Sequence, residues 1–363
     1  MKILVYFGHP AQYLFLRESI RRLSKNNKVT ILIKTKDVLE KLIKNDGFNY
    51  INILQKERGK SKISIAFSLL KRNIKIFPIL LKIKPDLLIG GDPSIAQLGK
   101  LLNIKRITIT EDDYSVIKTL ARLTFPFTET ILCPDVCSVG KWKSKKIGYC
   151  GYMKLAYLHP NVFNPRSSVL KKYSFDNKFV LIRLAKLTAH HDFGIKGIDS
   201  KLLDTIITII EDKNYKVYIS AEDVIDHKYQ KYLLEIEPSD MHHVLAMSSL
   251  LISDSQSMSV EAAMLGVPSL RYSSFAGRIS VLEELEHKYN LTFGIQIGKE
   301  NELLNKLNLL MNMANLTSEF QSRRKKMLSE KIDVTAFTVW FTENYPESLS
   351  IMKENRDFQH NFK

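Results

Sequence analysis

Short apolar segments alternate with amphipathic segments along the first half of the chain. The apolar segments have the length and the β-branched content of strands that are buried on both faces. They span residues 2–8, 28–34, 49–54, 86–91, 106–110 and 130–133. Helical periodicity lies between them, for example over residues 11–27 and 94–102. Strands that alternate with helices predict a parallel sheet with helices on both faces.

A loop over residues 157–168, which contains Pro160 and Pro165, interrupts this alternation. The alternation begins again with the apolar run 179–185. The second half therefore predicts a doubly wound sheet of its own. Ligands of open α/β sheets bind beyond the carboxyl ends of the strands, so we expect two such domains to face a central cleft.

These patterns divide the chain into an N-terminal Rossmann-like domain over residues 1–165, a C-terminal Rossmann-like domain over 166–333 and a final segment over 334–363. Two long helices are predicted at 300–330 and about 334–355. They lack an obvious strand partner, so we expect the last one to return and pack on the N-terminal domain.

The most informative segment is SDSQSMSVEAAMLGVPSLR, residues 253–271, in which a polar loop joins a buried strand to a helix. Polar residues can cap this helix, and Ser255, Gln256 and Ser257 then leave free backbone N–H groups at its positive end, which suits an anion. Glu261 lies about two turns in. This arrangement predicts a nucleotide diphosphate whose ribose hydroxyls donate to Glu261. An ordinary capped helix in an α/β domain is the alternative.

The positive charge of the chain is unevenly distributed. The formal net charge is +16, yet residues 1–165 hold 29 Lys and Arg against 12 Asp and Glu, whereas residues 166–363 hold 25 against 26. The whole excess therefore lies in the first half, which indicates that one domain faces an anionic partner.

The composition and the first residues of the chain indicate the cellular compartment in which the protein is expected. A hydrophobic content of 45% and a charged content of 25% are typical of soluble globular proteins. No apolar run reaches the roughly 18 residues that span a bilayer, and the first ten residues turn polar too quickly for a signal peptide. We therefore expect a cytoplasmic protein. The cysteines, Cys133, Cys137 and Cys150, lack zinc-site spacing and are expected to be free thiols.

Four loops that follow predicted strands carry polar residues that a buried core would exclude. In the first half they supply His9, Asp92 and the cluster Glu111 to Asp113. In the second half the loop 188–197 supplies His190, His191 and Lys196. Each loop alone is also consistent with a turn or a helix cap. Their shared location at strand ends favours a functional interpretation.

Two doubly wound halves with Ser-Asp-Ser, then Glu261, then Leu-Gly-Val-Pro resemble the GT-B superfamily. That superfamily includes MurG-like glycosyltransferases and the non-hydrolysing UDP-N-acetylglucosamine 2-epimerases. In both relatives a Glu precedes a Gly by five residues and a Pro by seven, as Glu261 precedes Gly266 and Pro268 here. The chain looks most similar to an uncharacterised bacterial and archaeal family of GT-B type that is often found among polysaccharide genes. The resemblance covers essentially the whole chain and implies two Rossmann-like domains facing a central cleft.

The resemblance also implies which residues bind a nucleotide sugar. Glu261 would hold the ribose, the start of the helix would hold the diphosphate, and His243 lies near the position where resembling proteins read the nucleobase. The loop around His190 resembles the His-Arg-Arg-Glu-Asn-Phe-Gly loop of the epimerases, which also have an arginine at the place of Arg271. The implied binding residues are His190, His191, Lys196, His243, Ser255, Gln256, Ser257, Glu261 and Arg271. This sequence departs from the epimerase pattern at two places. It has Gln256-Ser257 where the epimerases have Gly-Gly, and it does not keep both arginines of their Arg-Arg pair.

These residues lead to the prediction of a metal-independent glycosyltransferase that moves a sugar from a UDP-linked donor to a surface-polysaccharide or lipid-linked acceptor. The helix start, Lys196 and Arg271 can stabilise a diphosphate leaving group without a metal. No Asp-x-Asp metal motif occurs in the loops, and we expect no cofactor besides the donor substrate. The candidates for the catalytic base, expected in the N-terminal domain, are His9, Asp92 and Asp113.

Residues 56–84 mix lysines and arginines, among them Arg72, with large apolar residues. Such a segment suits the anionic inner face of a cell membrane, so peripheral membrane docking is expected. Packing on the sheet with the lysines in water is the commoner use of the pattern. Nucleic acid is not an expected partner, because the chain lacks a recognised module and interleaved aromatic residues.

Two further functions remain open. The first alternative is a non-hydrolysing nucleotide-sugar 2-epimerase that uses cleft carboxylates to eliminate and re-add the nucleotide. The second is a non-catalytic sugar-nucleotide-binding protein of a polysaccharide assembly complex.

Overall fold

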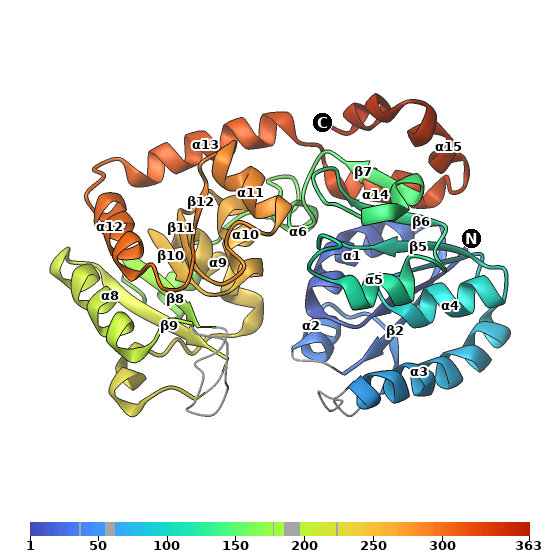
Figure 1. Ribbon diagram of the computed structural model, residues 1–363, viewed down its shortest axis with the longest axis horizontal. Coiled ribbons are helices and arrows are strands. Elements are labelled where there is room, and N and C mark those ends of the chain that lie inside the picture. The colour runs from blue at the N-terminus through green and yellow to red at the C-terminus, as the bar shows by residue number, and fades with distance from the viewer. Residues whose placement is uncertain (36–37, 55–61, 177, 185–196, 223) are drawn as a thin grey trace. The chain divides into compact units, whose positions relative to one another are not determined.

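The computed structural model describes residues 1–35, 38–54, 62–176, 178–184, 197–222 and 224–363. The chain forms two compact units (Figure 1). The first combines Met1–Val162 with Lys331–Lys363, and the second is Phe163–Glu330.

The first unit contains a seven-stranded parallel sheet in the order β3-β2-β1-β4-β5-β6-β7. The strands are β1 Lys2–Phe7, β2 Lys28–Lys34, β3 Tyr50–Leu54, β4 Leu87–Gly90, β5 Lys105–Ile109, β6 Thr130–Pro134 and β7 Lys146–Tyr149. Residues 3–7 of β1 and all of β4 are buried, which is why these strands read as continuous apolar runs. The strand order reverses between β1 and β4, the place where open α/β sheets bind ligands.

Helices cover both faces of this sheet. They are α1 Pro10–Leu23, α2 Leu39–Asn45, α3 Lys62–Ile83, α4 Pro93–Leu101, α5 Lys118–Thr124, α6 Leu155–Leu158, α14 Val334–Glu343 and α15 Glu347–Glu354. Ile76 and Leu80 of α3 pack into one core cluster with Leu4 and Tyr6 of β1. None of the helices in the described part of the chain has both the length and the sustained apolar character that crossing a bilayer requires.

The C-terminal segment belongs to the first unit. Helix α14 packs against α1 and α6, and the Thr335 hydroxyl donates to the Ala156 carbonyl at 2.8 Å. The backbone N–H of Cys150 donates to the Gln359 side chain at 2.6 Å. These contacts link residues after 331 to α6 and to the end of β7, which lie far away in the sequence.

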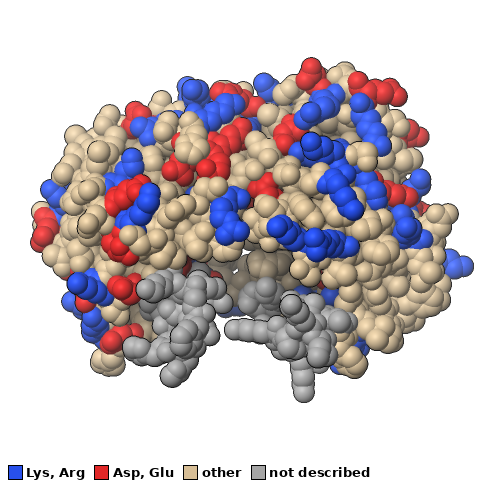
Figure 2. Space-filling view, viewed as in Figure 1, with Lys and Arg blue, Asp and Glu red and all other residues tan. Residues whose placement is uncertain are grey.

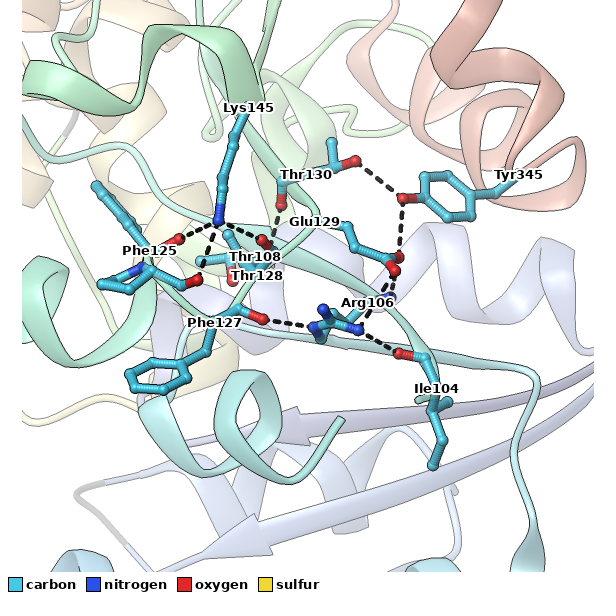
Figure 3. A network of polar contacts seen from close by, with 11 residues as sticks. Ile104, Arg106, Thr108, Phe125, Phe127, Thr128, Glu129, Thr130, Lys145 and Tyr345 are labelled. Carbon is cyan, nitrogen blue, oxygen red and sulfur yellow. Dashed lines mark hydrogen bonds and ion pairs between the residues drawn. The ribbon is translucent and has the colours of Figure 1, made fainter. Parts of the chain in front are cut away.

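A polar network joins the same segment to β5 and β6 (Figure 3). Tyr345 lies 3.0 Å from the Thr130 hydroxyl. Arg106 pairs with Glu129 at 3.3 Å and donates to the Ile104 carbonyl at 2.8 Å. Burial raises the pKa of Tyr345 to about 12, so its hydroxyl stays protonated in the neutral range. Every group named here has a protein partner, and the network is therefore structural.

The second unit contains a five-stranded parallel sheet in the order β12-β11-β10-β8-β9. Its strands are β8 Phe179–Leu184, β9 Lys216–Ala221, β10 Leu250–Ser253, β11 Ser269–Tyr272 and β12 Thr292–Ile295. Its helices are α7 Ser168–Lys172, α8 Ser200–Asp212, α9 Met241–Met247, α10 Gln256–Leu265, α11 Ser280–His287, α12 Glu300–Met311 and α13 Leu316–Glu330. The predicted α/β class with two doubly wound parallel sheets is confirmed.

The two long terminal helices that the sequence predicts are each broken in two. The 300–330 helix divides into α12 and α13, and an Asn-rich turn separates them. Asn side chains compete for backbone hydrogen bonds and favour helix ends. The 334–355 helix divides before Pro346, which lacks the N–H that a continuing helix needs.

Candidate functional site

The start of α10 presents backbone donors that the protein leaves unused. The Ser253 hydroxyl accepts from the Ser255 N–H at 2.7 Å, and the Ser255 hydroxyl caps the helix by accepting from the Met258 N–H at 3.4 Å. Within the described residues, the N–H groups of Gln256 and Ser257 have no hydrogen-bond partner. Unpaired amides at the positive end of a ten-residue helix form a site for an anion.

The side chains of Gln256 and Ser257 lie differently. The Gln256 amide donates to the Ser273 hydroxyl at 2.7 Å, which fixes the loop after β11. Ser257 is exposed and lies one turn before Glu261, on the same face of the helix. A ligand that contacts the first-turn amides can therefore follow this face toward Glu261.

The Glu261 carboxylate lies beside α9. Its side chain is 11% exposed, and Oε1 is 3.5 Å from Nε2 of His242. His242 is absent from the sequence-derived set of binding residues, which contains its neighbour His243. The His-His pair was visible in the sequence, but only the packing of α9 against α10 shows which ring meets the carboxylate. The Glu261 carboxylate can accept hydrogen bonds, and the His242 ring can donate or accept one. Together they suit a ligand with vicinal hydroxyls.

His243 contacts Phe163 and Arg166 rather than Glu261. Its ring stacks on Phe163 with a centroid separation of 4.7 Å, and its Nδ1 accepts from the Arg166 N–H at 3.1 Å. Burial and then the nearby Arg166 lower the pKa of His243. A neutral imidazole has one acceptor nitrogen, so the contact between Nε2 and the Arg166 guanidinium at 3.3 Å competes with the backbone contact. The role of His243 toward a nucleobase stays a prediction.

Arg271 is a buried cation with unused donors. It lies on β11 as the register partner of Ser253, and it is 0% exposed. All three guanidinium nitrogens lack a hydrogen-bond partner within the described residues. Among the described residues, the carboxylate oxygen within 4 Å is Oε2 of Glu286, which is 3.8 Å from Nη2 and also accepts from the Gly294 N–H at 2.9 Å. Burial lowers the pKa of Arg271 and raises the pKa of Glu286, as expected when two charges are desolvated together.

Gly294 provides the space for this guanidinium. A Cβ atom at this position would lie 2.3 Å from Nη2 of Arg271 and 3.1 Å from Oε2 of Glu286. Since Gly294 pairs with Arg271 across β11 and β12, the strand pairing itself fixes the arginine beside a residue without a side chain.

In the first unit, candidate residues follow three adjacent strands. His9 follows β1, Asp92 follows β4 and Glu111 follows β5, so all three lie at the carboxyl edge of one sheet. The first turn of α1 and the last residue of β5 approach closely at Gly91, which follows β4. A Cβ atom there would lie 2.4 Å from the Gln12 side chain and 3.0 Å from the Ile109 carbonyl oxygen.

The candidate bases of the first unit have structural partners. His9 is exposed and caps α1, because its Nδ1 accepts from the Ala11 N–H at 3.2 Å. Asp113 is 3% exposed and accepts from the Ser138 N–H at 2.7 Å. These contacts fix both side chains at the sheet edge, and the catalytic roles of His9 and Asp113 stay predictions.

Asp92 forms a buried ion pair. It caps α4 by accepting from the Ser94 N–H at 2.9 Å, and its Oδ1 lies 3.3 Å from Nε of Arg72. The side chain of Asp92 is 10% exposed and that of Arg72 is 4% exposed. Arg72 belongs to the basic segment 56–84, and no local sequence pattern indicates this pair.

Glu111 is held at two oxygens. Oε1 accepts from the Met153 N–H at 2.6 Å, and Oε2 lies 2.5 Å from Nζ of Lys154. The side chain of Glu111 is 11% exposed and that of Lys154 is 8% exposed. Glu111 thus resembles Asp92 in its place on the sheet and in having a nearly buried cation as a partner.

Three predicted phosphate-binding residues, His190, His191 and Lys196, lie outside the described residues. Across the residues that are described, no group of three or more His, Cys, Asp or Glu side chains could hold a metal ion. Metal independence stays an expectation.

The chain has structural neighbours but no match at the level of families. No protein-family model and no curated protein matches it. The UDP-GlcNAc 2-epimerase from Methanocaldococcus jannaschii aligns with a TM-score of 0.64 and 16% identity, over 90% of this chain and 100% of that one. The Neisseria meningitidis UDP-GlcNAc 2-epimerase bound to UDP-GlcNAc aligns with a TM-score of 0.60 and 15% identity, over 91% and 99%. The kitacinnamycin glycotransferase aligns with a TM-score of 0.59 and 12% identity, over 94% and 98%.

These alignments confirm the predicted GT-B type of fold. They contradict the leading functional prediction. Most of the solved structures compared are UDP-GlcNAc 2-epimerases rather than glycosyltransferases. A glycosyltransferase is therefore wrong as the leading interpretation, and the 2-epimerase alternative is the better supported one.

Proposed function

We propose that this protein is a nucleotide-sugar 2-epimerase that acts on a UDP-N-acetylglucosamine type of substrate. The observation that carries the proposal is the face of α10, where two unused first-turn amides precede a nearly buried Glu261. This spacing suits a diphosphate followed by a ribose. The 2-epimerase neighbours support the choice of reaction.

The second unit supplies the nucleotide site in this proposal. The Gln256 and Ser257 amides bind the diphosphate, and Arg271 supplies a cation for the same anion. Glu261 accepts from the ribose hydroxyls, while His242 orients the carboxylate from 3.5 Å away. The expected ligand is a UDP sugar, and no cofactor takes part.

The first unit supplies the acid and base. In the proposed reaction a carboxylate removes the proton from C2 of the sugar, the C1–O bond to UDP breaks and a C1–C2 double bond forms. UDP then adds back to C1, and a proton is delivered to the opposite face of C2. Asp92 and Glu111 are the strongest candidates, because both are fixed carboxylates at the ends of adjacent strands.

Incubation with UDP-N-acetylglucosamine in heavy water tests this reaction directly. We expect deuterium at C2 and the appearance of the C2 epimer, both followed by proton NMR, because the proton that returns to C2 comes from solvent. Binding of UDP without any deuterium at C2 would contradict the epimerase and favour a non-catalytic sugar-nucleotide-binding protein.

Replacing Glu261 by Ala should weaken UDP binding roughly 10- to 150-fold, because lost hydrogen bonds to a charged acceptor cost about 1.5–3 kcal/mol. Isothermal titration calorimetry with UDP measures the change. Glu302→Ala is the matched control, since Glu302 is an exposed glutamate on α12 of the same unit. An affinity equal to that of the wild type would remove Glu261 from the nucleotide site.

A further inference from the structure

Helix α3 of the first unit carries an exposed apolar stripe. The stripe consists of Phe67, Leu70, Ile74 and Leu81, whose exposed fractions are 70%, 56%, 64% and 49%. Successive members are three, four and seven residues apart, so they share one face of the helix. Four large apolar side chains exposed in a row are unusual on a protein surface and indicate a binding surface.

The stripe is not needed to hold α3 in place. The opposite face of the helix buries Ile76 and Leu80 in the core cluster of the sheet. Arg72, also on that side, is 3% exposed and contacts Ser68, Asp92 and Ser94. Because α3 is already anchored by this face, the apolar stripe is available to another partner.

The charge around the stripe has a single sign. Residues 62–84 contain six Lys and Arg and no Asp or Glu. Lys71 and Lys82 are exposed and have no ion-pair partner within the part of the chain that the structure describes. Lys75 instead donates to the Ile53 carbonyl at 2.7 Å. In Figure 2 the visible surface over α3 is largely uncharged, with Lys and Arg at its margins.

We propose that the apolar stripe of α3 docks on an anionic membrane surface. The four apolar side chains enter the boundary between headgroups and acyl chains, and Lys71 and Lys82 remain at the level of the anionic headgroups. A helix that lies in the interface combines an apolar face with flanking lysines in this way. Basic residues add attraction that is screened by salt. This inference goes beyond the proposed reaction and does not depend on it.

The charge argues against the two other occupants of such a surface. A symmetric contact between two copies would place the unpaired Lys71 and Lys82 of both copies near each other, where like charges repel. Nucleic acid would match the charge, but the stripe consists mainly of aliphatic side chains that offer bases no stacking platform.

Vesicle sedimentation with the full chain tests the docking. We expect wild-type protein to sediment with phosphatidylglycerol vesicles at low salt, to dissociate as salt is added, and to ignore phosphatidylcholine vesicles. Phe67→Ser combined with Ile74→Ser should reduce binding on the order of tenfold or more, because apolar surface no longer leaves water. Lys71→Glu combined with Lys82→Glu should have a similar effect through charge.

Matched controls lie in the second unit. Leu309→Ser removes another side chain that is 58% exposed, and Lys201→Glu with Lys213→Glu changes the net charge equally. Both should leave vesicle binding unchanged, and melting temperatures verify that all variants fold. The proposal is overturned if wild-type protein ignores phosphatidylglycerol vesicles, if Phe67→Ser with Ile74→Ser binds them normally, or if sedimentation equilibrium finds a dimer that this double variant disperses.

Discussion

Replacing Asp92 by Ala should lower the free energy of unfolding by about 3–5 kcal/mol, because it leaves the buried Arg72 guanidinium without its counter-charge. The Arg72 side chain is 4% exposed, and its other contacts are the hydroxyls of Ser68 and Ser94. The substitution also removes the acceptor that caps α4 through the Ser94 N–H.

Urea unfolding followed by circular dichroism measures this effect. Asp86→Ala is the control, since Asp86 is an exposed aspartate that accepts from the Lys2 N–H. The double variant Arg72→Met with Asp92→Ala should recover part of the loss, because no buried charge is left unpaired. A loss below about 1 kcal/mol in Asp92→Ala would show that the ion pair contributes little.

The same result decides how Asp92 is tested as a catalytic base. Loss of activity in Asp92→Ala cannot be assigned to chemistry if the first unit is destabilised. Asp92→Asn keeps a capping side chain of the same shape while removing the basic carboxylate. A folded Asp92→Asn protein that binds UDP but no longer exchanges deuterium at C2 would place Asp92 in the reaction.

The sequence predicts six strands of the first sheet but not the four-residue strand β7. A strand that is covered on both faces is a continuous apolar run, as in β1 and β4. The order of the strands in the sheet cannot be predicted in this way. The pairing of β1 with β4 depends on contacts between residues some 80 positions apart, such as Tyr6 with Gly90, which no local pattern encodes.

In the candidate site, too, local features were predictable from the sequence and contacts between distant residues were not. The cap of α10 by Ser255 involves neighbouring residues and was predictable. The contact of Glu261 with His242 and the ion pair of Asp92 with Arg72 join different elements. Their geometry depends on helix packing, so the sequence suggested the adjacent His243 and left Arg72 on the surface.

Replacing Arg271 by Met should weaken UDP binding while keeping or raising the stability of the fold. The guanidinium is 0% exposed and has no hydrogen-bond partner within the described residues. A buried cation whose donors are unused, and whose partner carboxylate lies 3.8 Å away, costs several kcal/mol, and an apolar side chain of similar size removes that cost. The anion of a ligand would give these unused donors the hydrogen-bond acceptors that Glu286 does not supply.

If the UDP diphosphate is that anion, the affinity of Arg271→Met for UDP should fall by about 2–5 kcal/mol, the usual effect of removing one partner of a buried charge pair. Binding of uridine, which lacks phosphate, should change little. Arg324→Met is the matched control, because Arg324 donates to the Met264 carbonyl at 2.6 Å and should lose stability without losing affinity. A destabilised Arg271→Met protein with normal UDP affinity would instead make Arg271 the structural partner of Glu286, 3.8 Å away.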